Sequence, residues 1–181
     1  MKMRLPILHG LAVAAGLFST AVSAITGTTS LRATFISTIE AGTCTAQVQD
    51  VTGKPVSTLA FGDVYKSDLT AKSRSEPFSV AFTACSGVKS ATVQVQKGTG
   101  GSCAGDAFDA SHAAAFEVWH GTAGGGTLLS CNAPANQSVT ISSGAGKLDL
   151  AARIVIANGK AISDVTTGNV SAPVTLVVTY Q

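Results

Sequence analysis

Short segments in which apolar and polar residues alternate make up most of this chain, and this period of two constrains the fold more than any other feature. Within the segment 76–85, for example, Phe78, Val80 and Phe82 fall on one parity and would share one face of a strand. Glycine-rich clusters such as residues 124–126 separate the segments, as is typical of turns. The pattern predicts a β-sandwich with strands at 45–51, 56–64, 76–85, 91–97, 114–120, 128–131, 139–141, 148–157 and 170–181.

Two local signals add detail to this prediction. Asn158-Gly159 stands between apolar runs and indicates a hairpin turn. The Ala-rich segment 106–115 has the composition of one or two helical turns. The sequence contains no internal repeat or linker, which predicts a single folded domain.

The first 24 residues have the pattern of a secretory signal peptide. Lys2 and Arg4 precede a short apolar run at 11–18, and Val22 and Ala24 fit the small-residue cleavage site. A buried N-terminal helix is the alternative interpretation. Neither this run nor any later one is long enough for a membrane span, so we expect an exported protein that does not span the membrane.

Cleavage after Ala24 would change the charge balance of the chain. Removing 24 of the 181 residues leaves 157, and removing Lys2 and Arg4 lowers the basic residues from 12 to 10, against 10 acidic ones. The mature chain is then neutral, with no basic patch that would indicate nucleic acid or an anionic membrane as a partner. Only 12% of the residues in the whole sequence are charged. Such a composition suits a protein that packs against other chains, although a neutral secreted domain remains an alternative.

Four cysteines remain after cleavage, and their spacing does not suit a metal site. Cys44, Cys85, Cys103 and Cys131 form no C-x-x-C pair. Export to an oxidising compartment makes disulfide bonds the expected state. Of the three possible pairings, the sequential one is the simplest.

The sequence offers no catalytic residues and no cofactor motif. Only His112 and His120 remain after cleavage, and neither accompanies a recognisable nucleophile or metal-binding motif. We therefore expect no catalytic, cofactor-binding or metal-binding residues. A secreted enzyme on a β-sandwich is the less favoured alternative.

A further alternating segment follows the predicted cleavage site. Its apolar residues Leu31, Ala33, Phe35 and Ile39 fall on one parity and predict a strand with one buried face. Chain ends are usually loose, so this strand needs a surface to cover. It could pair within its own sandwich or with another chain.

Several stretches, taken in order, resemble the structural subunits of bacterial chaperone–usher pili of the type 1 kind. They are GTCT at 42–45, LAFGDV at 59–64, FSVAFTAC at 78–85, and GNVSA at 168–172 followed by a last strand with a penultimate tyrosine. The resemblance implies an all-β, incomplete immunoglobulin-like sandwich that a donor strand from another chain completes. It also implies a Cys44–Cys85 disulfide, whereas Cys103 and Cys131 lie outside the shared pattern and are expected to pin a local loop.

The resemblance divides the chain into a signal peptide (1–24), an N-terminal extension that serves as donor strand (25–43) and a pilin domain (44–181). In the donor strand, Ser37 stands where the family commonly has glycine. The donor residues implied are Leu31, Ala33, Phe35, Ser37 and Ile39. The residues implied for the acceptor groove and the chaperone contact are Val174, Leu176, Val178 and Tyr180.

The function implied is that of a structural subunit of an adhesive pilus. Its partners would be neighbouring subunits, a periplasmic chaperone and an outer-membrane usher, and it would pass through the periplasm to the cell surface. The main alternative is a minor tip or adhesin subunit that binds a host glycan, for example with a loop near Trp119.

Overall fold

A computed structural model describes residues 34, 36, 37 and 41–181. The chain divides into two units, residues 1–38 and 39–181. In the first unit, Thr34, Ile36 and Ser37 are exposed and belong to no helix or strand. The predicted signal peptide and the predicted donor residues Leu31, Ala33, Phe35 and Ile39 lie outside the described residues.

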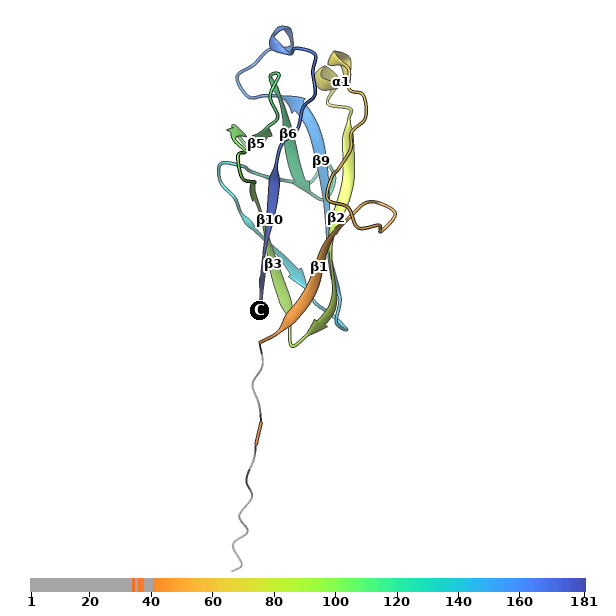
Figure 1. The fold of residues 1–181 in the computed structure, drawn as a ribbon, viewed down its shortest axis with the longest axis vertical. Helices are drawn as coiled ribbons and strands as arrows, with labels where there is room; N and C mark the ends of the chain where they lie inside the picture. The colour runs from red at the N-terminus through yellow and green to blue at the C-terminus, as the bar shows by residue number, and fades with distance from the viewer. Residues whose placement is uncertain (1–33, 35, 38–40) are drawn as a thin grey trace, which may run out of the picture. The chain divides into compact units, whose positions relative to one another are not determined.

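The second unit is built mainly from antiparallel strands (Figure 1). In chain order its elements are β1 (Thr43–Gln49), α1 (Lys66–Ala71), β2 (Ser75–Ser86), β3 (Ser90–Lys97), β4 (Cys103–Ala104), β5 (Ala107–Asp109), β6 (Ala114–His120), β7 (Thr127–Leu129), β8 (Asn136–Thr140), β9 (Gly146–Ile156), the 3-10 helix η1 (Ile162–Asp164) and β10 (Val174–Tyr180).

These strands form two sheets, as the sequence predicts. The larger sheet has seven strands in the order β1-β2-β9-β6-β5-β4, with β7 paired to β6, and the smaller sheet has three in the order β10-β3-β8. Both β1 and β10 are therefore edge strands, and they belong to different sheets.

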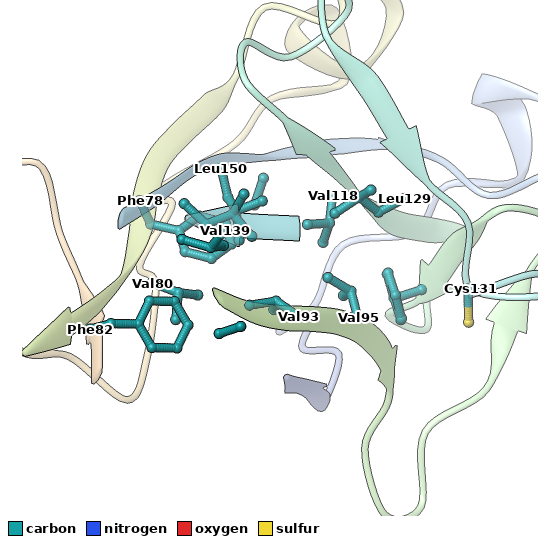
Figure 2. Close-up of a cluster of buried hydrophobic side chains, with 14 of the residues drawn as sticks. Phe78, Val80, Phe82, Val93, Val95, Val118, Leu129, Cys131, Val139 and Leu150 are labelled. Carbon is teal, nitrogen blue, oxygen red and sulfur yellow. The ribbon is translucent and has the colours of Figure 1, made fainter. Parts of the chain in front are cut away.

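The main core lies between the two sheets (Figure 2). Phe78, Val80 and Phe82 of β2 meet Val93 and Val95 of β3, and each is at most 8% exposed. Along β3 the buried residues alternate with partly exposed ones, so the period of two in the sequence corresponds to one buried face.

A smaller apolar cluster lies at the end of the domain that carries α1 and η1 (Figure 1). Leu69 of α1, Ile154 of β9 and Val165 are buried there, and Phe61 and Phe116 pack against them. The rings of Phe61 and Phe116 are 5.0 Å apart. Here α1 and the connecting segments that contain Phe61 and Val165 pack against the larger sheet.

Two disulfides link these elements. The first joins Cys44 in β1 to Cys85 in β2, with 4.1 Å between the Cα atoms. The second joins Cys103 in β4 to Cys131, which follows β7, with 5.7 Å between the Cα atoms. The bonds have the sequential pairing, and the second holds a local loop.

The predicted strand at 56–64 is wrong. Val56 donates its N–H to the carbonyl of Val48 at 2.9 Å, and Pro55 forms an isolated bridge with Gln49, but the rest of the segment joins no sheet. Its alternation reflects burial instead, because Leu59 and Phe61 pack against the core without a strand beside them.

Two other local predictions are also wrong. Asn158-Gly159 forms a turn but no hairpin, because β2 and β6 already occupy both sides of β9 and leave no edge for a returning strand. The segment 106–115 contains β5, a turn and the start of β6 rather than a helix, since pairing of the strands overrides the helical preference of alanine. The short helix α1 was not predicted.

We expect Phe82→Ala to lower the free energy of unfolding by about 4 kcal/mol, because Phe82 is fully buried and its removal leaves a cavity. Urea denaturation of the mature chain, followed by the fluorescence of Trp119, measures this change. Val51→Ala is the control, since Val51 is 72% exposed and should change stability little. Equal midpoints for the two variants would contradict this description of the core.

Candidate functional site

The two edge strands β1 and β10 belong to different sheets and both pack against the main core. Cys44 and Val48 of β1 and Leu176 and Val178 of β10 all pack against the main core, and all are only partly buried. The two strands are not hydrogen-bonded into one sheet. The core therefore extends to two separate sheet edges.

Tyr180 links the end of β10 to the start of β1. Its hydroxyl donates a hydrogen bond to the carbonyl of Cys44, with 3.2 Å between the oxygens. Its ring also lies edge-on to Phe82, with 6.4 Å between the centroids. The start of β1 and the C-terminus consequently lie at the same end of the domain (Figure 1).

The predicted acceptor residues share one face of β10. Leu176, Val178 and Tyr180 are partly buried and pack against the core, whereas Val174 is 38% exposed. The opposite face carries Thr175, Val177 and Thr179, which are all exposed, as a strand with one buried face requires.

The backbone of β10 has ladder partners on one side only. Gln181 and Ser90 exchange both backbone hydrogen bonds, at 2.8 and 3.1 Å, which marks them as a hydrogen-bonded antiparallel pair. Such pairs alternate along a ladder, so Thr175, Val177 and Thr179 bond to β3. The N–H and C=O groups of the predicted acceptor residues therefore point to the free edge of β10, where no described strand pairs with it. These residues are Val174, Leu176, Val178 and Tyr180.

A pocket of about 790 Å³ lies at the other end, next to the segment that leads into β10. Residues 58–66 form one wall and residues 165–170 the other. Ala114, Phe116 and Ile154 of the larger sheet also line it. Apolar side chains of the smaller cluster, such as Phe61 and Val165, share its lining with polar ones, such as Asp63 and Asn169.

Hydrogen bonds hold the wall at 165–170 in place. The Nδ1 atom of His112 lies 2.8 Å from the Thr166 hydroxyl, and the N–H of Thr166 donates to the carbonyl of His112 at 3.4 Å. A Cβ atom on Gly168 would come within 2.5 Å of the His112 ring, so a side chain there would displace this ring. Nothing in the sequence links residues 54 positions apart, so this contact could not be predicted.

A tight turn at Asp50 leads from β1 to the opposite wall. The hydroxyl of Thr52 and the N–H of Lys54 both donate to Oδ1 of Asp50, at 2.6 and 3.0 Å. These bonds lower the pKa of Asp50, and the bond from the Thr52 hydroxyl has the largest effect. The carboxylate thus remains an acceptor and stabilises the turn near neutral pH.

The site offers unpaired backbone groups, an apolar floor and a pocket, which suit an extended peptide rather than a reaction. Among residues 34, 36, 37 and 41–181, no group of three metal-ligating side chains is found. No described helix is long and apolar enough to cross a membrane. Within the predicted donor strand, only Ser37 is described, and it is exposed.

The indole of Trp119, a candidate for glycan contact, is engaged with neighbouring side chains. Its Nε1 atom donates to Glu117 at 3.1 Å, and the guanidinium of Arg153 lies 5.1 Å from the ring centroid. Arg153 also pairs with Glu117 at 2.6 Å, with both side chains largely buried. The indole therefore braces the outer face of β6 and β9.

Comparison with known proteins identifies relatives of this chain. It is 34% identical to the uncharacterized fimbrial-like protein YadL of Escherichia coli (strain K12), and the alignment covers 99% of this chain and 98% of that protein. No family model matches the chain.

Two solved structures share its fold at 20% identity. The P pilus rod subunit PapA matches with a TM-score of 0.50 over 76% of this chain and 99% of PapA. A subunit of a chaperone–usher pilus, in a study of rod uncoiling, matches with a TM-score of 0.53 over 84% of this chain and 96% of that one. The chain therefore belongs to the fimbrial-like protein family and has the fold of chaperone–usher pilus subunits.

Proposed function

We propose that the chain is a structural subunit of an adhesive pilus at the cell surface, joined to its neighbours by donor strands. The free edge of β10 is the observation that carries this proposal. A strand added there would complete the ladder with the backbone groups of Leu176 and Val178 and cover the core beneath them. The residues of 25–43 would supply such a strand to the next subunit.

Burial of apolar surface would stabilise this contact. Inserting four apolar donor side chains contributes very roughly 5–10 kcal/mol before the cost of ordering the strand. Ladder hydrogen bonds add to this contribution. An unfilled edge above an exposed core is an aggregation hazard, so the subunit needs protection before it assembles. A periplasmic chaperone that lends a strand, and an outer-membrane usher where strands are exchanged, would meet this need.

The contact would propagate a fibre, since each chain carries one donor segment and one acceptor edge. Such a contact is heterologous and need not close into a ring. An adhesin at the tip needs only the acceptor edge, whereas this chain carries an alternating segment before β1 as well. This feature favours a subunit within the fibre.

We expect that a chain without residues 25–39, but with the signal peptide, still binds its chaperone, because its acceptor edge is intact. It should donate no strand to a neighbouring subunit, because its donor segment is missing. Co-purification with the chaperone and immunodetection in sheared surface pili measure the two properties. Internal incorporation of the truncated chain into pili at the full-length level would contradict the proposal.

We expect Leu176→Asp to abolish accumulation in the periplasm, because a carboxylate on the inner face of β10 opposes burial beneath an added strand. Immunoblots of periplasmic extracts from cells that express the chaperone give the yield. Thr179→Asp is the matched control, since Thr179 is exposed on the opposite face of the same strand. Equal loss for both variants, or for neither, would argue against an acceptor groove on the inner face.

A further inference from the structure

We propose that the Cys103–Cys131 disulfide is a positioning element for β10: it holds the loop of residues 98–101 against Pro173 and thereby fixes the start of that strand. Both cysteines lie outside the pattern shared with the pilus family, so the resemblance assigns them no role in the sandwich. The inference concerns the isolated chain and does not depend on the proposed function.

The two ends of β10 are bonded to the smaller sheet unequally. At the C-terminal end, Gln181 and Ser90 exchange both backbone hydrogen bonds. At the N-terminal end the ladder continues to Pro173 and Gly98. Proline has no N–H, so this pair forms a single bond, from the N–H of Gly98 to the carbonyl of Pro173 at 2.8 Å. The start of β10 is therefore held less firmly by its own ladder than the end is.

The loop that follows β3 packs against Pro173. Gly101 donates its N–H to the carbonyl of Gly98 at 2.9 Å, which closes a turn beside the proline. A Cβ atom on Gly98 would lie 3.0 Å from the Cβ atom of Pro173, and one on Gly101 would lie 3.1 Å from its Cγ atom. The absence of side chains at both positions lets the turn approach the proline ring closely. The position of this loop therefore determines the position of Pro173.

The disulfide fixes the far end of the loop. Cys103 follows Gly101 by two residues and begins β4, which has only two residues and pairs with β5 alone. An edge strand this short has few ladder bonds of its own. The disulfide joins it to Cys131, which is 5% exposed and belongs to the main core. Loop 98–101 is thus held between β3 and a covalent link to the core.

Hydrogen bonds around the disulfide should preserve the fold without it. The N–H of Cys131 donates to the carbonyl of Asp106 at 2.9 Å, and the Ser130 hydroxyl donates to Oδ1 of Asp106 at 2.6 Å. Nearer the loop, the Ser102 hydroxyl donates to Asp109 at 3.0 Å, but this bond is exposed and competes with water. Loss of the disulfide should therefore loosen the loop rather than unfold the domain.

The first disulfide has a corresponding place at the other end of β10. There the hydroxyl of Tyr180 bonds to the carbonyl of Cys44, whose disulfide joins β1 to β2. Each end of β10 is consequently tied to a segment that carries a disulfide. Since the two bonds act at opposite ends, loss of the second should affect only the start of the strand.

Amide hydrogen exchange in the unassembled mature chain, resolved by NMR, tests the inference. The variant Cys103→Ala/Cys131→Ala removes the second disulfide. We expect the amides of Gly98 and Thr175 to exchange about tenfold faster relative to that of Thr179, because only the first two lie at the end that the loop holds.

Val80→Ala separates positioning from general stability. Val80 is 2% exposed in the core and lies outside the loop, so its truncation lowers the stability of the whole domain. The ratio between the three exchange rates should then stay the same. If this ratio is also unchanged in the variant without the second disulfide, that bond does not position β10 and the inference is wrong.

Gly101→Ala tests the contact with Pro173 while the disulfide stays intact. The added Cβ atom would crowd the proline ring, so the amides of Gly98 and Thr175 should again exchange faster, by about threefold relative to Thr179.

Thr99→Ala is the control within the same loop, since Thr99 is exposed and should leave the exchange rates unchanged. No effect of Gly101→Ala, or an equal effect of both variants, would mean that the loop does not act through Pro173. Neither measurement requires assembly, so the inference can fail while the proposed function stands.

Discussion

The backbone of β10 is hydrogen-bonded to β3 on one side. On the other side, the backbone N–H and C=O groups of Leu176 and Val178 point to a free edge. Beneath that edge lie side chains of the main core. An exposed edge and an exposed core at one place are costly for an isolated chain, because both favour uncontrolled association.

The two ends of the β10 edge differ, and this difference would give an added strand a direction. At one end Tyr180 bonds to the carbonyl of Cys44, while the Cys44–Cys85 disulfide fixes that part of β1 to β2. At the other end the domain has a pocket, whose wall is held by His112 and Thr166. A donor strand added at this edge, as proposed, would meet Tyr180 at one end and the pocket at the other.

The sequence predicted the β-sandwich and most of its strands because one face of each strand is buried. β6 matches its predicted bounds, and the predicted groove face of β10 is the face that packs against the core. The prediction failed where tertiary contacts decide the outcome: alternation at Leu59 and Phe61 reflects packing without a ladder, and Asn158-Gly159 has no free strand edge nearby. The contact between His112 and Thr166 could not be predicted, since a period of two carries no information on distant loops. The donor residues Leu31, Ala33, Phe35, Ser37 and Ile39 remain a prediction.

Hydrogen–deuterium exchange at the backbone amides of β10 tests the central claim most directly. The amides of Leu176 and Val178 should exchange rapidly in the unassembled mature chain and slowly in the assembled pilus, because only an added strand can bond to them. The amide of Val177 should be protected in both states, since it bonds to β3. Protection of Leu176 and Val178 in the unassembled monomer would contradict the account, because it would mean that the free chain already fills its own edge.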